Sequence, residues 1–170
     1  MLQSLTAKHN IMNRFFKTVL LTGLFVGTTD LMYACISVTV RTGKFPGKML
    51  YYIAGGALGL QSSMQGGNRV ALLGLFFHYF IAFAFTLLFF FLLPRVKFLS
   101  FDKYLVGMLY AIFVNLVMGQ LILRLSRLPV GPFDLADTAV PGWIIFGIVF
   151  GIPIAYKAYK YYGIKDQPLG

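Results

Sequence analysis

Three polar side chains, those of Asp30, His78 and Asn115, stand inside long apolar stretches of this sequence. A carboxylate near the centre of a bilayer costs at least about 2.5 kcal/mol, so such residues usually face a bundle interior or a water-filled cavity. An aspartate beside a histidine forms a pair whose protonation states are coupled, and an asparagine offers both a hydrogen-bond donor and an acceptor. Groups of these types pass protons or bind small cations in pumps and transporters.

Rows of small residues accompany each polar residue at steps of three and four, a spacing that keeps them on one helix face. Small residues allow membrane helices to approach closely. We therefore expect the faces that carry Asp30, His78 and Asn115 to meet inside a bundle. The rows contain Gly23, Gly27, Ala34 and Ser37 with Asp30, Ala71, Gly74, Ala82 and Thr86 with His78, Gly107, Ala111 and Gly119 with Asn115, and Gly147, Gly151 and Ala155 on a fourth stretch.

The three polar residues also lie at similar depths in their stretches. At a helical rise of about 1.5 Å per residue, Asp30 is roughly 15 Å from the outer end of its helix, and His78 and Asn115 are each roughly 12 Å from theirs. The sequence thus predicts one polar layer slightly outward of the membrane midplane. Two interpretations stay open: the layer is a pathway for protons or ions, or it holds the helices together at around 0.6 kcal/mol per contact.

The stretches that must position this layer are typical of membrane-spanning helices. Of the 170 residues, 58% are hydrophobic and only 12% are charged, and the mean hydropathy is +0.77. A soluble domain carries about 25% charged residues, whereas a spanning helix needs about 20 mostly apolar residues. We predict an all-α, polytopic membrane protein that forms a single domain, a bundle of four transmembrane helices over residues 18–40, 70–93, 104–123 and 139–156.

An apolar segment over residues 49–60 follows a basic, turn-rich stretch at 41–48 and precedes a polar, glycine-rich stretch at 61–69. Twelve residues are too few to span a bilayer as a helix. The segment therefore predicts an additional short helix between the first two spans, either lying at the interface or re-entering the membrane, with an ordinary loop as the third alternative.

The net charge of +10 arises from Lys and Arg in the predicted tails and loops. Nine of them lie in the two tails and the loop at 94–103, and six lie in the other loops. This bias favours cytoplasmic termini, and basic loops suit contact with membrane lipids. No basic helix or aromatic platform stands apart from the bilayer, so we do not expect nucleic acid as a partner.

Enzymatic and metal chemistry find little support in the sequence. A zinc site needs three or four ligands, and His78 with Asp30 supplies two. Cys35 is the only cysteine, which excludes an internal disulfide and a thiolate cluster. Ser37 and Ser126 fall outside the layer of His78, so a Ser-His-Asp arrangement is not expected. We predict no catalytic residue, no metal and no cofactor.

Two further acids lie in the proline-rich loop before the last span. Asp134 and Asp137 either pair with Arg124 and Arg127 or form an acidic outer mouth above the polar layer. Residues 137–138 also read as a capping start to the fourth helix, because Asp and Thr suit that position.

Glycines in the segment that does not span offer a surface for self-association. Gly55 and Gly59 are spaced for close helix contact and are not needed by the predicted bundle. We expect a homodimer or another homo-oligomer that uses this surface.

The second span, residues 74–85 with the sequence GLFFHYFIAFAF, resembles a segment of the YagU-like group of small bacterial inner-membrane proteins. The glycine-rich first helix and the Pro-Phe-Asp-Leu stretch at 132–135 are also similar to that group. The resemblance implies a bacterial inner-membrane setting and a four-helix plan. It implies no reaction and no site residue.

Two functions follow as expectations. The first is a small channel or transporter for protons or a small cation, with Asp30 and His78 as the titrating pair. The alternative is a non-transporting scaffold, or a protein that binds lipids or a partner. In that alternative the polar layer is structural and the basic loop at 41–48 meets headgroups.

Overall fold

The computed structural model describes residues 2–129 and 140–165, and every element in these two ranges is helical. Four helices are long and apolar enough to cross a membrane, namely Met12–Thr42, Asn68–Leu92, Lys103–Leu125 and Gly142–Tyr162. The predicted all-α bundle of a multi-pass membrane protein is therefore confirmed. Asp134 and Asp137 lie outside the described residues, as does the predicted helix cap at 137–138.

The first helix, α1 (Leu2–Thr42), is much longer than the predicted span, whereas α4 (Asn68–Leu92) agrees with it closely. Residues 2–17 contain neither Gly nor Pro, so nothing in that polar stretch stops the helix. The third span consists of α5 (Lys103–Val117), the π-helical η2 (Met118–Ile122) and α6 (Leu123–Leu125). The fourth consists of α8 (Val140–Phe146), the π-helical η3 (Gly147–Gly151) and α9 (Ile152–Tyr162).

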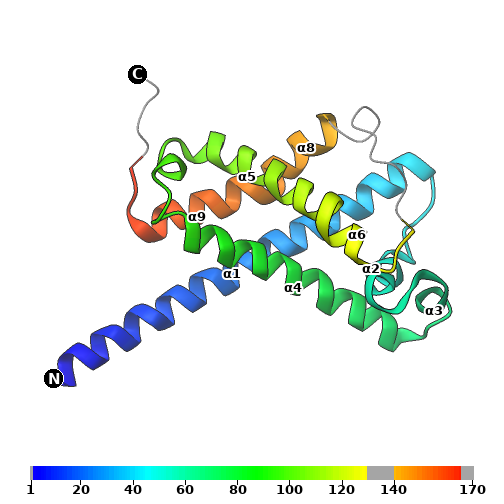
Figure 1. Ribbon diagram of the computed structural model, residues 1–170, viewed down its shortest axis with the longest axis horizontal. Coiled ribbons are helices and arrows are strands. Elements are labelled where there is room, and N and C mark those ends of the chain that lie inside the picture. Colours follow the sequence, from blue (N-terminus) through cyan, green and yellow to red (C-terminus); the bar gives the residue numbers. More distant parts are fainter. Residues whose placement is uncertain (1, 130–139, 166–170) are drawn as a thin grey trace.

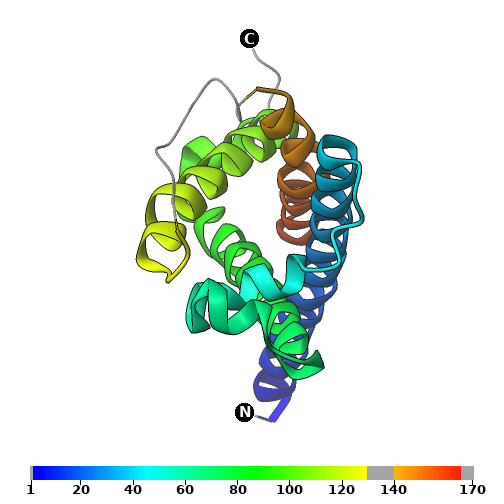
Figure 2. The same ribbon diagram turned by 90° about the vertical axis from the view of Figure 1, so that its right-hand side faces the viewer.

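The start of α1 and the end of α9 lie at one end of the molecule, which we call the terminal end (Figure 1). The end of α1 and the short helices α2 (Met49–Leu58) and α3 (Leu60–Met64) lie at the opposite end, which we call the distal end. Viewed from the distal end, the four spans are arranged as a ring (Figure 2). Residues on the inner faces of this ring can therefore meet from all four spans.

Glycines bring neighbouring spans into backbone contact, as the predicted rows of small residues require. A Cβ atom built on Gly151 would collide with the carbonyl oxygen of Gly107, and one on Gly107 would lie 2.8 Å from the Cα of Ile152. On α1, Gly27 packs against Tyr79 of α4, where a Cβ atom would come within 2.9 Å of the ring. Small residues thus set the spacing of both helix pairs.

The short helix α2 packs on α4, with the carbonyl of Leu50 against the Cα of Gly74. Gly59 ends α2 at a φ of 86°, a conformation that favours glycine, and the chain folds back as α3. Gly55 is consequently buried against Ser63 and Leu128 of the same chain. The expectation that Gly55 lies free for a partner is wrong, because α3 covers it. Homo-oligomerisation stays a prediction, without this surface.

A tightly packed aromatic core fills the half of the bundle near the terminal end. Phe89 and Phe90 of α4 are fully buried there. The hydroxyl of Tyr159 donates to the carbonyl of Leu99 at 2.5 Å, and that of Tyr162 donates to the carbonyl of Phe90 at 2.8 Å. These bonds fasten α9 to α4 and to the connection that follows it.

Candidate functional site

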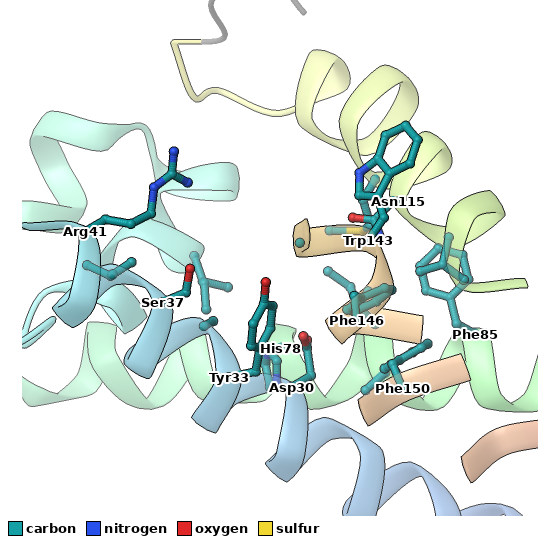
Figure 3. A pocket seen from close by; sticks show the side chains of 18 residues that line it. Asp30, Tyr33, Ser37, Arg41, His78, Phe85, Asn115, Trp143, Phe146 and Phe150 are labelled. Atoms are coloured by element: carbon teal, nitrogen blue, oxygen red, sulfur yellow. The ribbon is translucent and has the colours of Figure 1, made fainter. Parts of the chain in front are cut away.

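A cavity of about 450 Å³ opens within the ring of spans, and Asp30, His78 and Asn115 all line it (Figure 3). The structure thus brings the three predicted polar residues to one space. Apolar side chains of α4, α5, η2, α8 and η3 make most of the remaining wall: Ile81, Phe85, Val114, Met118, Phe146 and Phe150.

The carboxylate of Asp30 faces this cavity without a hydrogen-bond or ion-pair partner in the described part of the chain. It makes no hydrogen bond and no ion pair within residues 2–129 and 140–165. Across the same residues, every fully enclosed side-chain nitrogen or oxygen has a hydrogen-bond partner, so the oxygens of Asp30 are not enclosed. Figure 3 shows the carboxylate pointing into the space between Tyr33 and Phe146. A ligand or a water molecule in the cavity can therefore reach it.

The imidazole of His78 is held at one ring nitrogen, and the other has no hydrogen-bond partner among the described residues. Its Nε2 lies 2.7 Å from the carbonyl oxygen of Gly27 on α1. A carbonyl only accepts, so Nε2 carries a hydrogen and Nδ1 is the nitrogen that can gain or lose a proton. The ring packs edge-on against Tyr79 at 5.5 Å and is close enough to Asp30 to interact with its charge. Asp30 and His78 thus line the same cavity and lie close enough to interact, and their role as a titrating pair stays a prediction.

Asn115 lies on the opposite wall of the cavity, where Trp143 also projects inward (Figure 3). Its Nδ2 donates to the carbonyl of Ala111 on the same helix at 3.2 Å. The side-chain oxygen is therefore the atom of Asn115 left to face a ligand. Asn115 therefore adds a polar group to the wall opposite Asp30 and His78 and is not part of that pair.

Four further polar or amphipathic residues line the cavity that the sequence does not assign to the site: Tyr33, Ser37, Arg41 and Trp143. The sequence carries a signal for Arg41, because it continues the row of Asp30, Ala34 and Ser37 by one step of four. The predicted span ends at residue 40, which leaves Arg41 in a loop. In the structure α1 continues to Thr42 and keeps Arg41 on the cavity face.

The cavity runs along α1 from Arg41 to Asp30, a distance of roughly 16 Å at 1.5 Å per residue. Arg41 is exposed and marks the mouth at the distal end. The floor beyond Asp30 is formed by Phe85, Val114 and Phe150, which are 6%, 2% and 2% exposed. The cavity is thus open toward the distal end and closed toward the terminal end.

The third and fourth spans each contain a π-helical segment beside the cavity, a feature often found at functional sites. In η3 the distortion precedes Pro153, which has no N–H to donate to the carbonyl of Val149. The hydroxyl of Thr29 on α1 lies 3.0 Å from that carbonyl and donates to it. This bond compensates for the proline and ties η3 to α1 one residue before Asp30.

Metal ligation would need more groups than the described residues bring together. They contain no cluster of three or more His, Cys, Asp or Glu side chains. Asp30 and His78 are two ligands, which is too few for a tetrahedral site of protein groups. The arrangement is suited instead to binding and moving a proton between a carboxylate and an imidazole.

No protein-family model matches this chain, and searches of curated proteins and of solved structures also give no match. The resemblance to the YagU-like group is not tested by these comparisons and stays a prediction. The function is therefore argued from the site itself.

Proposed function

We propose that this multi-pass membrane protein is a transporter or channel for protons or a small cation. Asp30 and His78 are the titrating pair, and Asn115 is a polar group on the opposite wall. The observation that carries the proposal is the carboxylate of Asp30, which has no hydrogen bond or ion pair among the described residues and faces a cavity of about 450 Å³. An ionisable group inside a membrane bundle that a cavity reaches is a functional candidate by default.

The groups in the cavity favour the proton over a metal cation. Arg41 lies at the mouth, and Lys44 and Lys48 follow it in the exposed loop. Positive charge lowers the local concentration of protons and of other free cations alike. A proton needs only one lone pair as its acceptor, whereas Asp30 and His78 are too few ligands for a metal ion.

The closed floor favours a transporter over a permanently open pore. Phe85, Val114 and Phe150 separate Asp30 from the terminal end. A proton taken up from the distal end is released at the other end only after these side chains move. Protonation of Asp30 and His78, which changes the charge at the floor, is the step that we assign to this switch.

We place the protein in a bacterial inner membrane with cytoplasmic termini. Both ends of the described chain lie at one end of the bundle, as four spans require (Figure 1). The excess of Lys and Arg in the tails and the loop at 94–103 supports a cytoplasmic terminal end. The cavity then opens toward the periplasm.

Liposomes that contain a pH-sensitive dye test the proposal. The parent protein should let an imposed pH gradient collapse, and Asp30→Asn or His78→Ala should abolish that flux. Asp102→Asn is the matched control, because Asp102 accepts N–H bonds from Tyr104 and Leu105 at the start of α5 and lines neither the cavity nor its mouth. Asn caps helices as well as Asp, so this variant should retain flux. Parental flux in both cavity variants would refute the assignment.

A structural role for the polar layer is the second candidate, favoured by bonds between helices at this level. Besides the bond from His78 to Gly27, the hydroxyls of Thr28 and Tyr79 lie 2.8 Å apart. A scaffold that binds lipids or a partner predicts that Asp30→Asn lowers the unfolding temperature in detergent and that no flux exists. The transport proposal predicts an unfolding temperature near that of the parent, because Asp30 has no hydrogen bond or ion pair to lose among the described residues.

A further inference from the structure

A second cavity, of about 520 Å³, lies between α1 and α9 near the terminal end. It shares no lining residue with the cavity of Asp30 and is not used by the proposed function. Three cationic side chains line it, Arg14 from α1 and Lys157 and Lys160 from α9, and no carboxylate of the described chain does. The cavity therefore concentrates positive charge.

The two helices place these cations around one space. Lys157 and Lys160 are three residues apart and share a face of α9. The guanidinium of Arg14 lies 5.8 Å from the ring centre of Tyr161, the next residue of that face. The rings of Phe15 and Tyr161 are 5.7 Å apart, so these two residues lie at the same level. Because α1 and α9 are antiparallel, Lys157, four residues before Tyr161, lies level with Val19, four residues after Phe15. Lys157 thus lies roughly 6 Å further into the bundle than Tyr161.

Thr22 adds a hydrogen-bond donor without a partner. Its side chain is 3% exposed and lines the cavity, and its hydroxyl makes no bond within residues 2–129 and 140–165. The other described threonine side chains of α1 and α4 lie within bonding distance of the carbonyl four residues earlier, as is usual in helices. These are Thr18, Thr28, Thr29, Thr39, Thr42 and Thr86. The hydroxyl of Thr22 is therefore available to a ligand.

An apolar surface continues from the cationic end of the cavity. Leu21 and Phe25 line the same cavity one turn apart and are 56% and 55% exposed. They lie on the outer face of a membrane-spanning helix, where lipid tails pack. The cations and the hydroxyl donor suit the phosphate of a phospholipid. The apolar side chains beside them suit its acyl chain.

We propose that this cavity binds an anionic phospholipid of the leaflet at the terminal end. Lys157, Lys160 and Arg14 bind the phosphate as charge-assisted donors, and Thr22 donates a further hydrogen bond to a phosphate oxygen. Basic pockets between membrane helices bind anionic headgroups in this way. Leu21 and Phe25 contact an acyl chain.

Native mass spectrometry of the whole protein tests the site, with phosphatidylglycerol and phosphatidylcholine offered at equal concentration in micelles. The parent should retain one phosphatidylglycerol in preference to phosphatidylcholine. Lys157→Gln combined with Lys160→Gln should lose that preference. Lys44→Gln combined with Lys48→Gln removes the same charge at the distal end and should keep it. Equal retention by the parent and the Lys157 and Lys160 variant would overturn the proposal.

Thr22→Val tests the specific site against general attraction of lipids to basic surfaces. Valine has nearly the same shape, so loss of one hydrogen bond to a charged group should weaken binding of phosphatidylglycerol about tenfold. Thr22→Ser should restore it, and Thr39→Val, whose hydroxyl already donates to Cys35, should have no effect. Parental affinity in Thr22→Val would contradict the bond.

A free phosphate ion is the other source of the same chemistry. We expect inorganic phosphate added to phosphatidylcholine micelles neither to raise the unfolding temperature nor to displace phosphatidylglycerol. If phosphate alone reproduces the stabilisation that phosphatidylglycerol gives, the lipid assignment is wrong. If Thr22→Val fails to fold, Lys157→Gln combined with Lys160→Gln still tests the lipid site, because both lysines are exposed.

Discussion

In the proposed transport, His78 has two roles that its two ring nitrogens separate. Nε2 donates to the carbonyl of Gly27 and so joins α4 to α1. Nδ1 is the nitrogen to which the proposal assigns the exchange of a proton beside Asp30. A substitution that keeps the first role and removes the second can therefore distinguish transport from packing.

His78→Gln is that substitution, because a glutamine amide can donate to the carbonyl of Gly27 but cannot titrate. We expect proton flux in liposomes to be lost while the unfolding temperature in detergent stays near that of the parent. His78→Leu should lose flux and also about 0.6 kcal/mol of stability, the usual value of one bond between membrane helices. Full flux in His78→Gln would show that the imidazole is not part of the pathway.

At the scale of helices, backbone contact at glycine decides how the spans pack. Gly151 of η3 and Gly107 of α5 touch directly, and α2 rests on α4 through Gly74. Backbone atoms cannot rotate away as a side chain can, so these contacts tolerate no added Cβ atom. The same pair of helices, α5 and the one formed by η3 and α9, carries the π segments that border the cavity.

Gly151→Ala should therefore destabilise the bundle although alanine is the better helix former. The gain in helix propensity is about 1 kcal/mol, whereas overpacking costs about 1–3 kcal/mol, so we expect a net loss of up to about 2 kcal/mol. Unfolding in mixed micelles of increasing SDS content measures it. Gly56→Ala inside α2 is the control, because an added Cβ atom there would meet only the Cβ of Ser126 at 3.7 Å, an ordinary contact, so this variant should not lose stability. A Gly151→Ala variant as stable as the parent would mean that α5 and η3 are not in contact.

At the scale of the whole molecule, the two cavities lie toward opposite ends and carry different charges. The cavity of Asp30 opens beside Arg41 at the distal end, and the cationic cavity lies between α1 and α9 near the terminal end. The floor of Phe85, Val114 and Phe150 keeps the first cavity from reaching the terminal end. We therefore expect Asp30 to be accessible from the distal end only.

Labelling of an engineered cysteine tests that one-sided access. In a Cys35→Ala background, Ser37→Cys places a thiol in the wall of the cavity. A charged reagent that does not cross membranes should label it only when added to the side opposite the termini, as measured in sealed vesicles of both orientations. Ser63→Cys is the control, because Ser63 is fully buried and should stay unlabelled from either side. Labelling of Ser37→Cys from the side of the termini would contradict the closed floor.

The sequence by itself determined the four spans and the residues of the polar layer. Hydropathy and helical spacing are local properties, so they can be read along one stretch at a time. For this reason the sequence identifies Asp30, His78 and Asn115 without any knowledge of which helices are neighbours. The row of Asp30, Ala34 and Ser37 continues to Arg41, but the predicted span leaves Arg41 out because it ends two residues before α1 does.

Only the tertiary structure decided what surrounds those residues, because that depends on which helices are neighbours. Asn115 faces Asp30 across the cavity since α5 and α1 lie on different sides of the ring (Figure 2). Gly55 is buried because α3 folds back over it, and the spacing of residues within α2 does not predict this contact. Arg14 and Lys157 stand far apart in the sequence, and only the antiparallel packing of α1 and α9 brings them to one cavity.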